Sequence, residues 1–439
     1  MEGERKTLTQ LSVPICLETL FYMLSGMVDT LMLSSVSDQA VGAVGTANTY
    51  IGVFIIMFGV ISSGMVAVMS QNIGAGRPGI AYQARQLGLV FNALTGILMS
   101  VVLAVFSGGI LRAVSIAPAL LESAETYLKI VGGASFLNAL IPIFSSYLRV
   151  FGYTKHSLIG TVVGNVINII LNSVFLFVFN WGVMGVAAAT VFSKVVNLII
   201  VAAMGAVLIK AKQSPERAQP RKILAQIVKI GFPSAFETAL YNVAMTFIVC
   251  FMNHMDTDGM NVTARSYAMQ IANFSYCVGA ALAQANAIMT GWRIGAKKYE
   301  ECDRGTRKAV IYGLVTATCF SVTFAITGRF IVHIFTNDIQ MIELVVKLLV
   351  VDIFLEFGRV TNLVYGQALK TSGDAIFPVI MGAIFMYLFA VGGTYFLGIH
   401  MGLLAVGAYI AMAGDECARA VGMVLRWKSG KWKSKSLVE

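Results

Sequence analysis

Long apolar segments separated by short polar loops run through the whole chain of 439 residues. Each segment is long enough to cross the hydrocarbon core of a membrane as a helix, which takes about 20 apolar residues. The segments lie at 10–34, 41–70, 82–110, 122–150, 157–180, 184–209, 223–251, 262–290, 308–333, 342–370, 375–397 and 402–426. The pattern predicts an all-α integral membrane protein with twelve transmembrane helices.

One polar break divides these segments into two sets of six. Residues 210–222 read KAKQSPERAQPRK and form the only long polar stretch that contains two prolines. We therefore predict an N-terminal six-helix lobe over 1–210, a cytoplasmic linker over 211–222, and a C-terminal six-helix lobe with a basic tail over 223–439.

The two halves share features at a nearly constant spacing, which indicates an internal duplication. The residues Pro14, Glu18, Thr19 and Tyr22 recur 219 positions later as Pro233, Glu237, Thr238 and Tyr241. The loops QNIGAGR at 71–77 and WRIGAKK at 292–298 are a second match. An even number of helices in each repeat predicts two lobes related by a pseudo-twofold axis along the membrane normal, as in many transporters.

Composition and charge fit a membrane protein. Hydrophobic residues make up 57% and charged residues 12% of the chain, about half the ~25% charge content of soluble domains. The net charge of +10 needs no nucleic-acid partner, because Lys and Arg gather in the loops of one side. By the positive-inside rule we expect both termini and the linker in the cytoplasm. With no cleavable signal peptide and short tails, we expect a prokaryotic plasma membrane.

The first apolar segment contains two acids, Glu18 and Asp29. Together with Tyr22 they fall on one face of a helix. A carboxylate inside the hydrocarbon layer costs at least ~2.5 kcal/mol, so it marks a candidate functional site. Asp29 has no counterpart in the second half, where the equivalent position is Ile248.

The fifth segment carries Asn165, Asn168 and Asn172 on one helical face. Their carbonyl oxygens could bind a hard cation, or their amides could join neighbouring helices by hydrogen bonds. The positions equivalent to Asn168 and Asn172 are Phe389 and Gly393. Because this polar set is missing from the second half as a whole, we favour the cation site.

Glu18 and Glu237 are acids that both halves keep, each four residues after a proline. A kink or helix start at the proline can expose them. With Tyr22 and Tyr241 they could line a negative cavity suited to amphipathic cations. The alternative is that each acid caps a helix or forms hydrogen bonds within its own lobe.

The tenth and twelfth segments hold a second group of charges. Its members are Asp352, Glu356, Arg359, Asp415, Glu416 and Arg419. Four acids and two bases leave a formal charge of −2. Ion pairs explain two of the acids, and the excess indicates a shared proton or a bound cation. Asp352, Glu356 and Arg359 are therefore candidates for the substrate cavity or a second proton or cation site.

Several motifs taken together resemble the MATE family, the multidrug and toxic compound extrusion antiporters. The motifs are Pro14 fifteen residues before Val28-Asp29-Thr30, AVGAVG at 40–45, QNIGAGR at 71–77, NxxxN in the fifth segment, Gly-x-x-Gly opening the sixth and SGKWK at 429–433. The resemblance implies a V-shaped pair of six-helix lobes that exports organic cations in exchange for Na⁺ or H⁺.

The resemblance also implies a coupling-cation site at Asp29, Asn168, Asn172 and Thr190. Position 172 is Asp in some branches of the family and Asn here, so both Na⁺ and H⁺ remain candidate coupling ions. Na⁺ needs about five or six oxygens, which these side chains and the carbonyl near Val186 could provide. We expect no other metal and no cofactor.

Two other functions are compatible with a polytopic membrane protein. A lipid-linked oligosaccharide flippase of the same superfamily should carry buried bases for a pyrophosphate, whereas the charges recognised here in the first lobe are acidic. A membrane enzyme should show a His–acid pair or a nucleophile with its base, which the sequence lacks. We expect a monomer in membrane lipid that acts on small organic cations.

The positive-inside distribution generates a topological prediction. Reporter tags at residue 215 and at the C-terminus should both be found in the cytoplasm, and a tag near Asp258 should be found outside. A periplasmic signal from residue 215 would overturn the arrangement of twelve helices.

Overall fold

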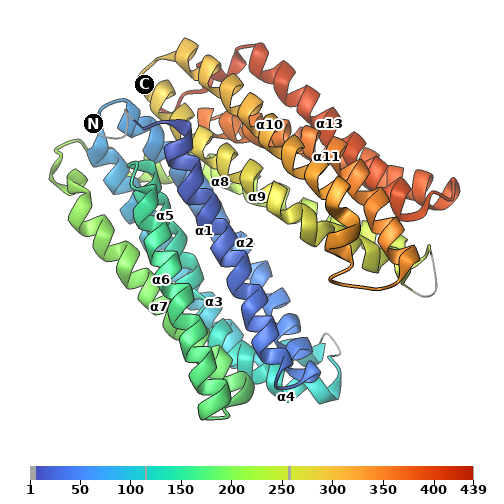
Figure 1. Cartoon of the computed structure of the whole chain (residues 1–439). Helices are drawn as coiled ribbons and strands as arrows, with labels where there is room; N and C mark the ends of the chain where they lie inside the picture. The colour runs from blue at the N-terminus through green and yellow to red at the C-terminus, as the bar shows by residue number, and fades with distance from the viewer. Residues whose placement is uncertain (1–5, 114–115, 256–258, 439) are drawn as a thin grey trace. The chain divides into compact units, whose positions relative to one another are not determined.

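The computed structural model describes residues 6–113, 116–255 and 259–438 (Figure 1). Within these ranges the chain is helical and contains no strand. The tag position near Asp258 lies outside the described residues.

The helices follow the predicted segments closely. In the first half they are α1 (Leu8–Ser34), α2 (Asp38–Gly74), α3 (Pro78–Ala113), α4 (Pro118–Tyr127), α5 (Phe136–Val150), α6 (Thr154–Ser173) and α7 (Gly182–Leu208). In the second half they are α8 (Pro220–Asn253), α9 (Met260–Gly295), α10 (Tyr299–Val332), α11 (Ile339–Ser372), α12 (Ile376–Phe385) and α13 (Leu404–Lys428). Wider π-helical turns extend α4, α6 and α12, the last of them as far as His400.

The predicted segment 122–150 is not one straight helix. It consists of Pro118–Gly132 and Phe136–Val150, which meet at a bend of 42°. The break follows the pair Gly132-Gly133, where the absence of side chains weakens a helix. Hydropathy could not show the bend, because the apolar pattern continues through it.

Eight helices in the described ranges are long and apolar enough to cross a membrane, or nine if the bent pair counts as one span. The three remaining long helices are α9, α11 and α13. These three carry most of the buried charges of the second half, such as Asp352 and Arg419. Their lower hydropathy therefore reflects a polar interior and not a missing span.

The chain forms two compact units. Within the described ranges, unit 1 contains residues 17–231, with Lys6, and unit 2 contains residues 7–16 and 232–438. The division thus cuts α1 and α8 close to their internal prolines, Pro14 and Pro233. A proline inside a helix removes one backbone hydrogen bond, so each helix passes from one unit to the other where it is weakest.

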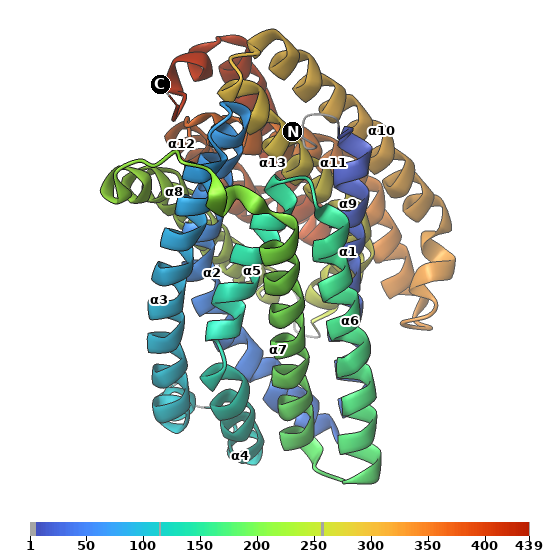
Figure 2. The ribbon, with the colours of Figure 1, turned by 90° about the vertical axis from the view of Figure 1, so that its left-hand side faces the viewer.

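Inside unit 1, α3 lies beside α5, and α7 lies beside α5 and α6 (Figure 2). The first turns of α8 join this unit through two glycines. A methyl group on Gly64 of α2 would meet the carbonyl oxygen of Ile227, and one on Gly231 of α8 would meet that of Val60. The helix backbones touch here because neither residue has a side chain, as is common between membrane helices.

This contact predicts different effects for two alanine substitutions in α2. Gly64→Ala should lower the stability of the detergent-purified protein, by about 1–3 kcal/mol as for other overpacked positions. Gly59→Ala is the matched control, because a methyl group there meets no atom within 4 Å, and it should be neutral or stabilising. Thermal unfolding followed by tryptophan fluorescence measures both, and equal stabilities of the two variants would contradict the close contact.

Candidate functional site

Unit 1 brings Asp29 of α1 against the polar face of α6. The Nδ2 atom of Asn172 donates a hydrogen bond of 2.6 Å to Oδ1 of Asp29 and one of 3.3 Å to Oδ1 of Asn168. Asn165 is not hydrogen-bonded to this group, because its Nδ2 donates to the backbone oxygen of Phe21 at 2.8 Å. The structure therefore places three of the four predicted cation ligands within hydrogen-bonding contact.

One atom of this group has no partner. Asn172 is fully buried, and its Oδ1 receives no hydrogen bond within the described residues. An unsatisfied buried carbonyl is unfavourable, but it is a suitable ligand for a hard cation. If the Asn172 amide turned over, this oxygen would face Asp29 and Asn168 in place of the NH₂ group. The donor set thus fits a small cation or a proton.

The fourth predicted ligand, Thr190 of α7, is also buried. Its hydroxyl donates to the Val186 oxygen at 2.8 Å, so the two predicted oxygen ligands of α7 lie together. Tyr127 of α4 interacts with Thr190 and lies within the field of Asp29. Thr190 has no hydrogen bond to Asp29 or Asn172 in the described part of the chain. The sequence pattern did not single out Tyr127, which interacts with Thr190 by a hydrogen bond and with Asp29 electrostatically.

Lys194 of α7 is a second residue that the sequence analysis missed. Its Nζ donates a hydrogen bond of 2.9 Å to Oδ1 of Asn138, and its charge acts on Asp29. The statement that the first lobe's charges are acidic was therefore wrong, because Asp29 and Lys194 together are formally neutral. The rule that identified Asp29, an ion inside an apolar segment, would also have found Lys194.

The two acids kept in both halves are each paired with a base of their own unit. In unit 1, Glu18 is buried and lies 2.7 Å from Nη2 of Arg149, and Ser157 donates to it at 3.0 Å. In unit 2, Oε2 of Glu237 lies 2.6 Å from Nζ of Lys370. Arg149 and Lys370 are equivalent positions of the two repeats, because Leu148-Arg149 recurs 221 positions later as Leu369-Lys370. The duplication therefore includes the whole ion pair, and the charge of each acid is balanced locally.

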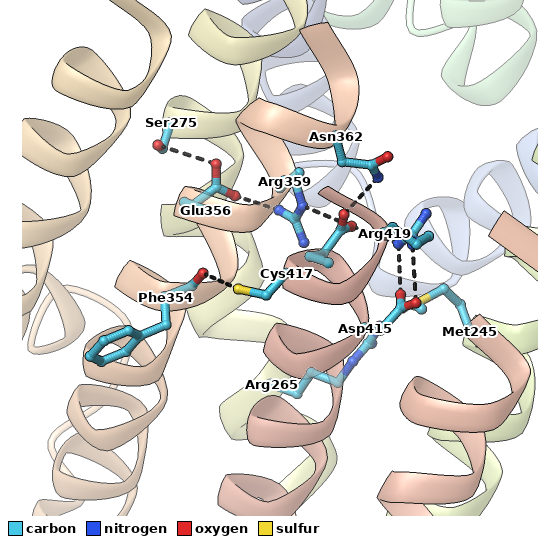
Figure 3. Close-up of polar contacts among 11 residues, drawn as sticks. Met245, Arg265, Ser275, Phe354, Glu356, Arg359, Asn362, Asp415, Cys417 and Arg419 are labelled. Carbon is cyan, nitrogen blue, oxygen red and sulfur yellow. Dashed lines mark hydrogen bonds and ion pairs between the residues drawn. The ribbon is translucent and has the colours of Figure 1, made fainter. Parts of the chain in front are cut away.

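A chain of ion pairs joins α11 and α13 in unit 2 (Figure 3). Arg359 contacts Glu356 and lies 3.6 Å from Glu416. Arg419 lies 2.6 Å from Asp415 and 3.0 Å from Glu416. Further hydrogen bonds to this network come from Ser275 and Asn362. The two guanidinium groups thus form ion pairs with three carboxylates, those of Glu356, Asp415 and Glu416.

Asp352 and Arg265 stand outside this network, although both are buried at 4% and 7% exposure. Arg265 lies inside α9, where it is buried (Figure 3). The sequence analysis did not include it among the charges of this region. Its only described side-chain contact is a 3.7 Å approach of Nη2 to the sulfur of Met245. Including Arg265 reduces the charge excess predicted for this region from −2 to −1.

A cavity of about 430 Å³ opens among these residues in unit 2. Four of the predicted site residues line it, namely Glu237, Tyr241, Asp352 and Arg359. Glu356 does not line the cavity but contacts Arg359, which does. Glu18 and Tyr22 belong to unit 1, where Tyr22 is 65% exposed. A role of Glu18 and Tyr22 in substrate binding stays a prediction.

The protein is a helical membrane protein with two sequence repeats and with buried charged residues around a cavity. These features are typical of secondary transporters. The family model MatE matches residues 14–174 and 233–396, one match in each repeat. The chain therefore belongs to the MATE family of membrane transporters, and it is not an enzyme.

Similar proteins cover nearly the whole chain. The uncharacterized transporter YisQ of Bacillus subtilis (strain 168) is 32% identical over 437 residues, covering 98% of this chain and 96% of YisQ. The probable multidrug resistance protein NorM of Thermotoga maritima is 26% identical, with 99% and 94% covered. A crystal structure of a MATE protein in its straight conformation matches with a TM-score of 0.89 at 19% identity, covering 97% of this chain and 96% of that one.

The contact between Asp29 and Asn172 generates a prediction for Asn172→Asp. Two carboxylates at this distance repel, so they should hold a proton between them. Efflux from vesicles should then depend more strongly on pH than in the wild type, with activity favoured when the pair holds one proton.

The control for this variant is Asn165→Asp, which adds an acid to the same helix where the amide contacts the Phe21 backbone instead. It should not reproduce the altered pH profile. An unchanged profile in an Asn172→Asp protein that still transports would mean that residues 29 and 172 are not neighbours.

Proposed function

We propose that this protein is an antiporter that exports amphipathic, mostly cationic drugs or metabolites in exchange for inward Na⁺ or H⁺. The observation that carries the proposal is the contact of Asp29 with Asn172, beside an unsatisfied buried oxygen. The multidrug resistance names of relatives such as NorM support the substrate class. We further propose a monomer in the cell membrane with both termini in the cytoplasm.

The geometry offers a physical link between the ion and the conformation. Without a cation, the Asn172 amide donates to Asp29 and so joins α6 to α1. A cation or proton on Asp29 replaces this hydrogen bond and changes how α1 is held. An ion can shift a conformational equilibrium only through such a difference in contacts between two states. Alternating access would follow if the two states of α1 favour opposite openings.

Lys194 changes the charge of the region that the coupling ion enters. Its ammonium group interacts with Asp29 electrostatically, so the two residues together carry no net negative formal charge to attract Na⁺ from solution. A proton on Asp29 would leave Lys194 as a net positive charge near the site, and Na⁺ would add the same charge. Varying Na⁺ and pH separately in the transport assay identifies which ion the site accepts.

Lys194 also removes the charge argument against a lipid-linked oligosaccharide flippase. The preference for an antiporter now depends on family membership and on the Asp29 site. A flippase would use several bases on a pyrophosphate, whereas Arg359, Lys370 and Arg419 are engaged with carboxylates of unit 2. Arg265 and Lys194, which form no ion pair within the described residues, lie in different units.

The proposed function predicts the behaviour of Asp29→Asn, which keeps the volume of the side chain and removes its charge. Ion-driven efflux of a fluorescent cation from proteoliposomes should fall to near background, about tenfold or more below wild type, as expected for a lost essential ion site. Expression and thermal stability should stay near wild type. Asn168→Ala and Thr190→Ala should weaken the ion dependence in the same assay.

The matched control is Ile410→Val, a conservative change in α13 of unit 2 that should leave the ion dependence as in wild type. Robust ion-driven transport by Asp29→Asn would exclude the proposed coupling site. Loss of transport with loss of folded protein would point to a structural role, which the stability measurement separates.

A further inference from the structure

A second cavity lies in unit 2 where the first turns of α10 meet the end of α13, and its volume is about 540 Å³. The buried rings of Trp427 and Trp432 line it and stack on each other, with 4.2 Å between their centroids. The indole nitrogen of Trp427 donates a hydrogen bond of 2.9 Å to Oδ1 of Asp303 in α10. The indole nitrogen of Trp432 donates one of 3.0 Å to the backbone oxygen of Trp427. Hydrogen bonds therefore fix the aromatic part of the wall in place.

The same wall carries an excess of positive charge. Its two acids are Glu300 and Asp303, and its five bases are Arg304, Arg307, Lys308, Lys428 and Lys433. Arg307 pairs with Asp303, with 2.6 Å between Nη2 and Oδ2. The four other bases form no ion pair within the described residues, and four bases against the one remaining acid leave a formal charge of +3. Bases gathered on one wall repel one another and attract an anion.

An apolar helix face leads away from this cavity. Ile311 of α10 lines the cavity and is exposed, and Val315 is exposed one turn further along the helix. Lys308, Ile311 and Val315 lie at i, i+3 and i+7, so they share one face of α10. The same order, with a base at the cavity and exposed apolar residues beyond it, occurs on α13 at Lys428, Leu425 and Val421. Because α10 is apolar enough to cross a membrane, a hydrocarbon chain can lie along its exposed face.

We propose that this cavity binds the phosphate headgroup of an anionic phospholipid, with an acyl chain of the lipid along the face of α10 that begins at Ile311. Lysine and arginine side chains form strong charge-assisted hydrogen bonds with phosphate oxygens. Basic pockets beside transmembrane helices at the cytoplasmic side suit anionic headgroups, and the proposed topology places this end of α10 and α13 in the cytoplasm.

Two features favour a lipid over a soluble anion. Inorganic phosphate would satisfy the bases but would make no use of the apolar face that continues from them. The aromatic residues of the wall, Tyr299, Trp427 and Trp432, are of the types that gather where a membrane meets water. The site shares no residue with the Asp29 site or with the cavity around Asp352. The proposal therefore stands independently of the proposed antiport.

The test is lipid binding to the detergent-purified full-length protein, measured by native mass spectrometry. The protein is titrated with phosphatidylglycerol, which is anionic, and with phosphatidylcholine of the same acyl chains, which has no net charge. The wild type should bind its first phosphatidylglycerol about tenfold or more tightly than its first phosphatidylcholine, because each base near an anionic headgroup contributes about fivefold. An excess of inorganic phosphate should leave the bound lipid in place.

A triple variant with Arg304→Gln, Lys308→Gln and Lys428→Gln should lose this preference, so that the ratio of the two dissociation constants approaches one. The matched control carries Lys155→Gln, Lys210→Gln and Arg221→Gln, which remove the same number and kinds of exposed bases from unit 1. The control should keep the wild-type ratio. Thermal unfolding shows whether each variant is folded. If the triple variant does not fold, Lys428→Gln alone should lower the preference about fivefold.

A wild-type protein with no preference for phosphatidylglycerol would overturn the proposal. A folded triple variant that keeps the preference would overturn it as well. An equal loss in the matched control would show that overall charge, and not this cavity, attracts the lipid. Displacement of the lipid by inorganic phosphate would identify the cavity as a site for a soluble anion and exclude the lipid.

Discussion

The ion pair that fastens each proline-containing helix to its own unit is the contact on which the architecture depends. Glu18 and Glu237 each follow a proline by four residues and meet Arg149 and Lys370. An acid left alone in the hydrocarbon layer would be expensive, so each must find a base nearby. Because the same pair occurs in both repeats, the first helix of each half enters its unit at an equivalent point. The proline interrupts the helix and the ion pair anchors it again.

Apart from this shared ion pair, the two units differ in their buried charged residues. Unit 1 has a carboxylate bound by an amide, and Lys194 interacts with this carboxylate electrostatically. Unit 2 has a dense ion-pair network and two ions without partners, Asp352 and Arg265. A duplicated protein with identical sites would bind the same ligand twice. The two units have therefore diverged in charge, and in the proposed function the coupling ion binds at Asp29 of unit 1.

The sequence was sufficient for features that depend on local pattern. Helix ranges and the repeat follow from hydropathy and spacing, and the placement of Asp29 near Asn172 followed from helical periodicity together with the family resemblance. The partners of ions could not be predicted in the same way, because they depend on which helices pack together. Arg265 illustrates the difficulty, since a base near a helix end can extend to the interface or turn inwards. Only its 7% exposure inside α9 decides between the two.

The division of α1 between the units suggests how the ion site could act at a distance. Residues 8–16 of this helix belong to unit 2, whereas Glu18 and Asp29 lie in unit 1. Glu18, which pairs with Arg149, lies between Pro14 and Asp29, the residue that we propose binds the ion. In the proposed mechanism, a change in the hydrogen bond at Asp29 acts on a helix that continues past Pro14 into the other unit. Coupling along one covalently continuous helix needs no long-range field and no chain of side-chain contacts, and α8 cannot do the same because Ile248 stands where α1 has its acid.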